Sequence, residues 1–273
     1  MFARGKNSRK GSRHNGSAKG LDSLVPIFRS DTLYLDDRIV VFSNPDTVLA
    51  EQFRFLRSKV VHPEGGVTPR TILVTSAVEK EGKTFIVGNL AAALCQGIDE
   101  YVLLVDADLR NPSIHTLYHG IQHDTGLATH LEQSTPLNEL LQKTPIEKLT
   151  ILPGGDYATK PLELLSSEKM RSFIREVRNR YPDRFVIFDS SPLELAPEAS
   201  IIAKEVDAVL MVVHYGKTPR QLVESALAKL PREKLLGVVF NGYGKHLEQY
   251  NKYRAKYGYV YGTYDRSSGP RRS

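Results

Sequence analysis

Gly82, Lys83 and Thr84 are residue types that hold a phosphate group and a magnesium ion. With Ala77 they match the spacing of the phosphate-binding motif G-x-x-x-x-G-K-[ST], except that Ala77 replaces the first glycine. A glycine lets the backbone approach a phosphate, a lysine supplies charge for the β- and γ-phosphates, and a threonine hydroxyl binds Mg²⁺. The spacing predicts a nucleotide site, and the alternative is a helix cap that carries a lysine.

Aspartates stand directly after two other apolar runs. Asp106 and Asp108 follow residues 101–105, and Asp189 follows residues 185–188. A single aspartate at a strand end is often only a cap or a turn former. Several carboxylates behind a phosphate-binding loop favour a magnesium site, because Mg²⁺ is held by one or two carboxylates and a hydroxyl. The candidate metal ligands are Thr84, Asp106, Asp108 and Asp189.

Alternating apolar and amphipathic segments predict the elements that position these residues. Strands are expected at 71–75, 101–105, 149–152, 185–188, 208–213 and 235–240. Helices are expected at about 46–60, 83–96, 167–180, 198–205 and 219–229, with one or two more between 112 and 142. Strands that alternate with helices predict an α/β fold, a doubly wound and mostly parallel sheet of the P-loop NTPase type. Ligands then collect at the carboxyl ends of the strands.

Composition excludes several other classes of protein. With 41% hydrophobic and 25% charged residues, the 273-residue chain is ordinary globular material. No run of eighteen apolar residues and no signal-like N-terminal segment is present, which predicts a cytoplasmic protein without a membrane span. Cys95 is the one cysteine, so an intrachain disulfide and a zinc–cysteine cluster are excluded.

Basic residues are concentrated at both ends of the chain. Residues 1–30 hold seven Lys/Arg against one acid and residues 241–273 hold seven against two, which leaves 23 of the 37 basic and 28 of the 31 acidic residues between them. Solvated tails are one interpretation, and attraction to an anionic membrane surface is the other. Nucleic acid is not expected as a partner, because no base-reading fold is visible. The predicted division is a flexible basic arm at 1–38, a P-loop domain at 39–242 and a tyrosine-rich tail at 243–273.

The tail and one early helix carry further candidate residues. Seven of the thirteen tyrosines lie between 243 and 264, among polar residues that favour exposure. An adhesive or base-stacking tail is the alternative to a functional one. In the helix at 46–60, Glu51, Arg54 and Arg57 lie on one stripe of the helix surface. They form either an ion pair within the helix or a contact with another subunit.

Together these segments resemble the bacterial tyrosine kinases (BY-kinases) of polysaccharide export. The resemblance rests on SAVEKEGKT (76–84) as Walker A, LLVDADLR (103–110) as the family's Walker A′, and FVIFDSSP (185–192) as Walker B. It extends to Glu51-x-x-Arg54-x-x-Arg57, to the segments at 161–166 and 237–241, and to the tyrosine-rich tail, so it covers about residues 45–264.

The resemblance implies an ATP- and Mg²⁺-dependent tyrosine autokinase of exopolysaccharide synthesis, acting in trans within a homo-oligomer or ring. It implies Lys83, Asp106 and Asp108 as catalytic, with Asp106 as the base, and Glu51, Arg54 and Arg57 as ring contacts. The nucleotide would be held by Glu79, Lys80, Glu81, Gly82, Lys83, Thr84, Phe85 and Asn241. The phosphoacceptors would be Tyr250, Tyr253, Tyr257, Tyr259, Tyr261 and Tyr264. Expected partners are a membrane adaptor of the chain-length-determinant type, which places the kinase at the inner face of the membrane, and a cognate tyrosine phosphatase.

Departures from the family pattern lie mainly in the phosphate-binding loop. The usual Pro-Gly-Glu-Gly-Lys-Ser is Glu79-Lys80-Glu81-Gly82-Lys83-Thr84 here, and Lys160 replaces a common asparagine. The competing class is a partition or division-site ATPase of the deviant-Walker type, which binds membrane or DNA. Its signature lysine is absent at Val78, and the tyrosine-rich tail also disfavours this class.

Overall fold

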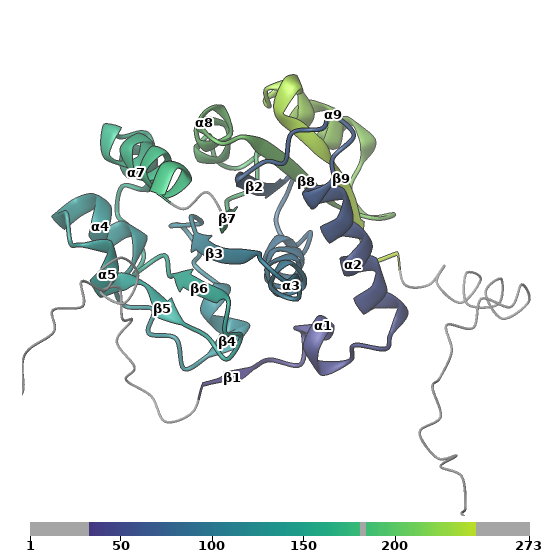
Figure 1. The fold of residues 1–273 in the computed structure, drawn as a ribbon. Helices are drawn as coiled ribbons and strands as arrows, with labels where there is room; N and C mark the ends of the chain where they lie inside the picture. Colours follow the sequence, from purple (N-terminus) through teal and green to yellow (C-terminus); the bar gives the residue numbers. More distant parts are fainter. Residues whose placement is uncertain (1–32, 181–183, 244–273) are drawn as a thin grey trace, which may run out of the picture.

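A seven-stranded sheet forms the centre of the computed structural model, which describes residues 33–180 and 184–243 (Figure 1). The strand order is β5-β6-β3-β7-β2-β8-β9, and all neighbours are parallel except β5 and β6. The strands are β2 (Thr71–Ser76), β3 (Tyr101–Asp106), β5 (Gln142–Lys143), β6 (Leu149–Leu152), β7 (Arg184–Asp189), β8 (Ala208–His214) and β9 (Leu235–Asn241). The predicted doubly wound, mostly parallel α/β fold is confirmed.

Helices cover both faces of this sheet. One apolar core joins the sheet to α1 (Val40–Ser43), α2 (Val48–Val61) and α3 (Lys83–Cys95). The other joins it to α4 (Leu127–Gln133), α5 (Leu137–Leu140), α6 (Pro161–Leu165), α7 (Glu168–Arg180), α8 (Glu198–Glu205) and α9 (Arg220–Ala228). Figure 1 accordingly shows α2 and α7 on opposite sides of the strands.

The central strands are buried because both of their faces carry helices. All six residues of β2 are buried, and only Tyr101 of β3 is exposed. Parallel strands covered in this way need continuous apolar runs instead of alternation. The same runs made these strands predictable from the sequence.

A small second sheet lies beside the main one. It consists of β1 (Tyr34–Leu35) and β4 (Tyr118–His119), which pair antiparallel; β4 follows the 3₁₀ helix η1 (Ile114–Thr116). Asp36 holds this region together, since its carboxylate accepts bonds from Arg38 and lies 3.2 Å from the His119 ring. The predicted start of order near Ile39 was therefore too late, because the pairing partner of β1 is distant in sequence.

The predicted basic arm and tyrosine-rich tail lie mostly outside the residues that the structure describes. Residues 1–32 and 244–273 lie outside them, and so do the candidate acceptors Tyr250, Tyr253, Tyr257, Tyr259, Tyr261 and Tyr264. Within the described ranges, no helix has both the length and the apolar character needed to cross a membrane. Cys95 is buried, and burial raises the pKa of its thiol to about 12, as fits a packing role.

Candidate active site

The loop from Ala77 to Gly82 joins β2 to α3 and turns through two unusual backbone conformations. Gly82 has φ +87° and caps α3, and a Cβ there would collide with the side-chain amide of Asn241. Only glycine meets both conditions at this position. Lys80 has φ +60°, which non-glycine residues adopt with strain, and it stands where the family pattern has glycine.

Glu81 braces the loop from inside. Its side chain is buried, with Oε2 accepting from the Val78 N–H at 2.9 Å. Oε1 accepts from the His214 N–H and from the Thr218 hydroxyl, which ties the loop to the end of β8. The Glu81 carboxylate is thus committed to the loop, and its carbonyl accepts from the Asn241 amide, which leaves its backbone N–H for the predicted role in nucleotide binding.

Lys83 and Thr84 open α3 beside the carboxylates. Lys83 is nearly buried, and its positive charge acts to lower the pKa of both Asp108 and Asp189. The Thr84 hydroxyl donates to Asp189 Oδ2 at 2.7 Å, and the Ser113 hydroxyl lies 2.8 Å from the same threonine oxygen. The structure therefore brings the predicted phosphate and metal residues together at one end of the sheet.

Asp106 and Asp189 are neighbours because β3 and β7 pair in register at these residues. Both carboxylates are 1% exposed. Asp106 Oδ2 accepts from the backbone N–H groups of Ser113 and Ile114, at 2.8 and 3.0 Å. The first turn after Walker A′ therefore fixes the orientation of the Asp106 side chain.

The donor set around Asp189 fits a magnesium ion. Asp189 Oδ1 is buried and has no hydrogen-bond partner among the described residues, while Oδ2 holds the Thr84 hydroxyl. A buried carboxylate oxygen without a partner is uncommon and needs an explanation such as an ion or water. In the described ranges, no group of three or more His, Cys, Asp or Glu side chains is arranged to hold a metal ion by protein ligands alone. This agrees with Mg²⁺, which keeps waters and shares its sphere with phosphates instead of filling an all-protein cage.

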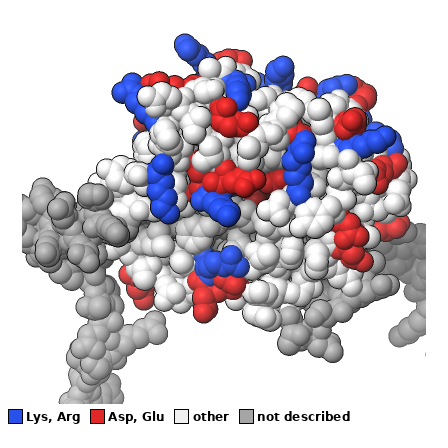
Figure 2. All heavy atoms as spheres, turned by 180° about the vertical axis from the view of Figure 1, so that it is seen from behind, with Lys and Arg blue, Asp and Glu red and all other residues white. Residues whose placement is uncertain are grey.

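Burial and mutual repulsion make these aspartates more basic than usual. Desolvation raises the pKa of Asp106 well above its ordinary value, and the charge of Asp189 raises it further. Desolvation also raises the pKa of Asp108, and that of Asp189 to about 6, against the opposing charge of Lys83. Figure 2 shows acidic side chains gathered across the middle of the rear face, with lysine and arginine side chains around them.

Arg110 and Glu198 form an ion pair that sequence reasoning missed. Arg110 Nη2 and Nε donate to Glu198 Oε1 at 2.7 and 3.0 Å, and Glu198 is 1% exposed. The pair joins the loop after β3 to the start of α8, which follows Asp189 along the chain. The arginine of D-x-D-x-R signalled the need for an acidic partner, but nothing local identified Glu198.

Other predicted nucleotide residues contact the protein itself. The Phe85 ring packs edge-on against Phe53 of α2, with ring centroids 5.7 Å apart. The Asn241 amide donates to the carbonyl of Glu81 at 2.8 Å, so it supports the loop at the end of β9. Glu79 and Lys80 are exposed on the loop and free of such ties within the described residues.

The Glu51, Arg54 and Arg57 stripe on α2 contains an ion pair within the helix, which is one of the two interpretations offered by the sequence. Arg54 donates to Glu51 Oε2 at 2.7 Å and to the Pro45 carbonyl, and Arg57 lies 3.7 Å from Glu100. Glu51 and Arg54 keep 41% and 36% of their side-chain surface exposed. The ion pair leaves them accessible, so the subunit-contact interpretation stays a prediction.

Removing the negative charge of Asp189 should stabilise the folded protein when neither metal nor nucleotide is present. Its pKa is about 6 folded and about 3.9 unfolded, so the folded state binds more protons and loses stability as pH rises between these values. We expect Asp189→Asn to raise the free energy of unfolding by about 3 kcal/mol at pH 7.5, and by roughly half as much near pH 5. Urea denaturation at both pH values measures this. A variant less stable than wild type at pH 7.5 would contradict this. It would show that the hydrogen bonds of Asp189 stabilise the fold by more than its buried charge destabilises it.

Comparison with known proteins decides the family. A family model described as an AAA domain matches residues 70–225. The chain is 31% identical over 229 residues to tyrosine-protein kinase YwqD of Bacillus subtilis, covering 83% of this chain and 92% of that protein. The chain belongs to the bacterial tyrosine kinase family. Its P-loop is accordingly that of a nucleotide-binding domain.

Solved structures agree with this assignment. The kinase domain of Escherichia coli tyrosine kinase ETK superposes with a TM-score of 0.69 at 26% identity, covering 75% of this chain and 79% of that one. The septum site-determining protein MinD of Pyrococcus horikoshii shares the fold, with a TM-score of 0.51 at 22% identity. The chain thus shares its fold with a division-site ATPase, and this likeness carries no information about function.

Proposed function

We propose that this bacterial tyrosine kinase uses ATP to phosphorylate the tyrosine cluster of its own C-terminal tail, in trans between subunits of a homo-oligomer. The observation that carries the proposal is the convergence of Lys83, Thr84, Asp106 and Asp189 at the ends of adjacent strands. The lysine supplies charge for the phosphates, and the carboxylates supply a base and metal ligands.

In this reaction Asp106 takes the proton of the acceptor tyrosine. The phenolic oxygen forms a bond to the γ-phosphorus, the bond from that phosphorus to the β,γ-bridging oxygen breaks, and ADP leaves with the electron pair. Lys83 holds the phosphates during the transfer, and Thr84, Asp108 and Asp189 would hold Mg²⁺. When bound, that ion would supply positive charge for the phosphate oxygens.

The proposed setting is exopolysaccharide synthesis or export. The succinoglycan biosynthesis transport protein ExoP of Rhizobium meliloti is 33% identical over 265 residues, covering 91% of this chain and 32% of that protein. The chain therefore spans about a third of that relative. On the family resemblance, we also propose two partners. One is a membrane protein of the chain-length-determinant type, as adaptor and activator, and the other is a cognate tyrosine phosphatase.

Mass spectrometry of the purified protein tests the autokinase directly. After incubation with ATP and Mg²⁺ we expect phosphate on several of the six candidate tail tyrosines, Tyr250, Tyr253, Tyr257, Tyr259, Tyr261 and Tyr264. Parallel samples lack ATP or contain EDTA, and should carry none. The membrane adaptor is added in a further sample. If phosphate is then found only on tyrosines outside the tail, the proposed acceptor assignment is wrong.

Assembly should control the rate if transfer occurs between subunits. A tethered tail reaches an effective concentration near the millimolar range at a neighbouring site. We expect Glu51→Ala, Arg54→Ala and Arg57→Ala together to reduce oligomer mass in light scattering and to lower the autophosphorylation rate about tenfold at low protein concentration. Excess protein should restore part of the rate.

A second helix offers a matched control for this triple variant. Glu168, Arg171 and Arg175 of α7 form a similar exposed ion-pair cluster of one acid and two arginines on the opposite side of the sheet. Their replacement by alanine removes the same charges and should leave mass and rate unchanged. Equal, concentration-independent rates in the two triple variants would indicate transfer within one chain and no role for the stripe in assembly.

A further inference from the structure

The last strand of the sheet is apolar but incompletely covered. β9 has the sequence LLGVVFN, yet none of its residues is fully buried, and Phe240 is 59% exposed. It pairs with β8 on one side, and no described residue pairs with its other edge. An uncovered apolar edge strand is a template for another strand, and proteins normally cover or charge such an edge.

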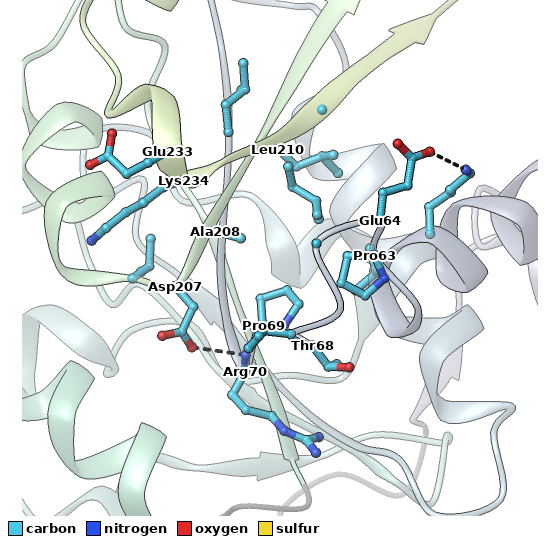
Figure 3. Close-up of a pocket in the computed structure, with 18 of the residues that line it drawn as sticks. Pro63, Glu64, Thr68, Pro69, Arg70, Asp207, Ala208, Leu210, Glu233 and Lys234 are labelled. Atoms are coloured by element: carbon cyan, nitrogen blue, oxygen red, sulfur yellow. Dashed lines mark hydrogen bonds and ion pairs between the residues drawn. The ribbon is translucent and has the colours of Figure 1, made fainter.

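A groove of about 990 Å³ borders β9 near its first residues (Figure 3). Its apolar wall includes Leu56 and Val60 of α2, together with Val238 and Val239 of β9. Seven charged side chains line it, four basic and three acidic, and four of the seven pair with one another: Lys59 with Glu64 at 3.1 Å and Arg178 with Asp207 at 3.0 Å. The opposite charges nearly balance, so the groove fits an uncharged segment better than a strongly charged one.

Gly237 adds an observation from the middle of the strand. A Cβ built on this residue meets no atom within 4 Å. The described structure therefore does not require glycine there for space. Gly237 pairs with Leu210 at the register shift that follows Val209, so glycine here accompanies a β-bulge between β8 and β9.

The two ends of the chain outside the described residues differ in their fit to this surface. Residues 1–30 carry seven basic residues and one acid, which a groove of nearly balanced charge does not complement. Residues 257–264, YGYVYGTY, carry no charge and place Tyr257, Tyr259 and Tyr261 in strict alternation, the period of a strand.

The point at which the described chain ends also favours the tail. Tyr243 stands two residues after the end of β9, and its ring centroid lies 4.7 Å from that of Tyr215, whose ring also contacts Phe240. The tail thus starts from an aromatic cluster at the carboxyl end of the open edge. Residues 244–256 are long enough to reverse the chain, so an antiparallel pairing with β9 is within reach.

We propose that residues 257–264 of the same chain dock along the free edge of β9 as an added antiparallel strand. β9 is seven residues long, and the eight-residue tail segment matches that length. This state occupies Tyr257, Tyr259, Tyr261 and Tyr264. Phosphorylation adds about −1.5 to −2 charge per tyrosine and releases the segment from an apolar surface, a consequence that rests on the proposed function.

Hydrogen exchange measured by mass spectrometry tests the docking without ATP, so its result is independent of kinase activity. The test variant carries Val260→Pro and Tyr261→Pro, because prolines at two successive positions remove one N–H from each edge of a strand. The matched control carries Ser267→Pro and Ser268→Pro. A third variant, Gly237→Lys, places a charge on β9 where the described structure has room for it.

We expect peptides covering 235–241 to exchange about tenfold faster in the Val260→Pro/Tyr261→Pro and Gly237→Lys variants than in wild type and in the serine control. Peptides covering β2 and β3 should not change, which shows that the variants fold. Equal exchange of β9 in all four proteins would overturn the docking. Protection of β9 that disappears on dilution would assign the strand to another copy and overturn docking within one chain.

Discussion

Replacing Lys83 by methionine is expected to lower autophosphorylation by about 100- to 1,000-fold, because one preorganised charge facing the transferred phosphate is lost. Methionine keeps a similar volume and an unbranched stem, so the buried side chain is replaced without a large cavity. The expected loss is in rate and nucleotide affinity, and the far-ultraviolet circular dichroism should stay that of wild type.

A lysine at the other end of the sheet is the matched control for this variant. Lys59 is 71% exposed at its side chain, and its one ion pair among the described residues is with Glu64, which is 91% exposed. Lys59→Met removes the same charge and should retain wild-type activity, since exposed pairs contribute little. Phosphotyrosine formation is followed over time with radiolabelled ATP. Undiminished labelling of Lys83→Met would remove the P-loop lysine from the proposed mechanism.

The strands and the principal site residues could be predicted because their signals are local. Buried parallel strands are continuous apolar runs; Asp106 and Asp189 end two of them, and Lys83 and Thr84 follow a third after a six-residue loop. The topology then requires them to meet, because the carboxyl ends of parallel strands lie at one edge of the sheet. The register of β3 with β7, which makes Asp106 and Asp189 neighbours, came only from the structure.

Side-chain partners that are distant in sequence could not be predicted. Glu81 looked like a loop residue facing phosphate, but its carboxylate accepts bonds from His214 and Thr218, more than 130 positions away. Glu198 lies 88 positions from Arg110 and has no motif of its own. In both cases a buried charge needs a partner, and sequence shows the need without showing the partner.

Replacing Asp106 by asparagine is expected to lower kcat by about 100- to 10,000-fold, the range lost when a general base is removed. Asparagine has nearly the same shape, and its carbonyl oxygen can still accept from the N–H groups of Ser113 and Ile114, as Asp106 Oδ2 does at 2.8 and 3.0 Å. The turn after β3 should therefore keep its conformation. The lost function is uptake of the tyrosyl proton.

The split between kcat and KM separates a base from a metal ligand. A base acts on the acceptor, so Asp106→Asn should leave KM for ATP within about threefold of wild type while kcat falls. Asp189→Asn, which alters the carboxylate bonded to Thr84, should raise the Mg²⁺ concentration needed for half-maximal rate. Asp46→Asn, on an exposed residue before α2, controls for the loss of one negative charge. If Asp106→Asn raises KM or the Mg²⁺ requirement without lowering kcat at saturation, Asp106 is a binding group, and the proton must leave the tyrosine by another route.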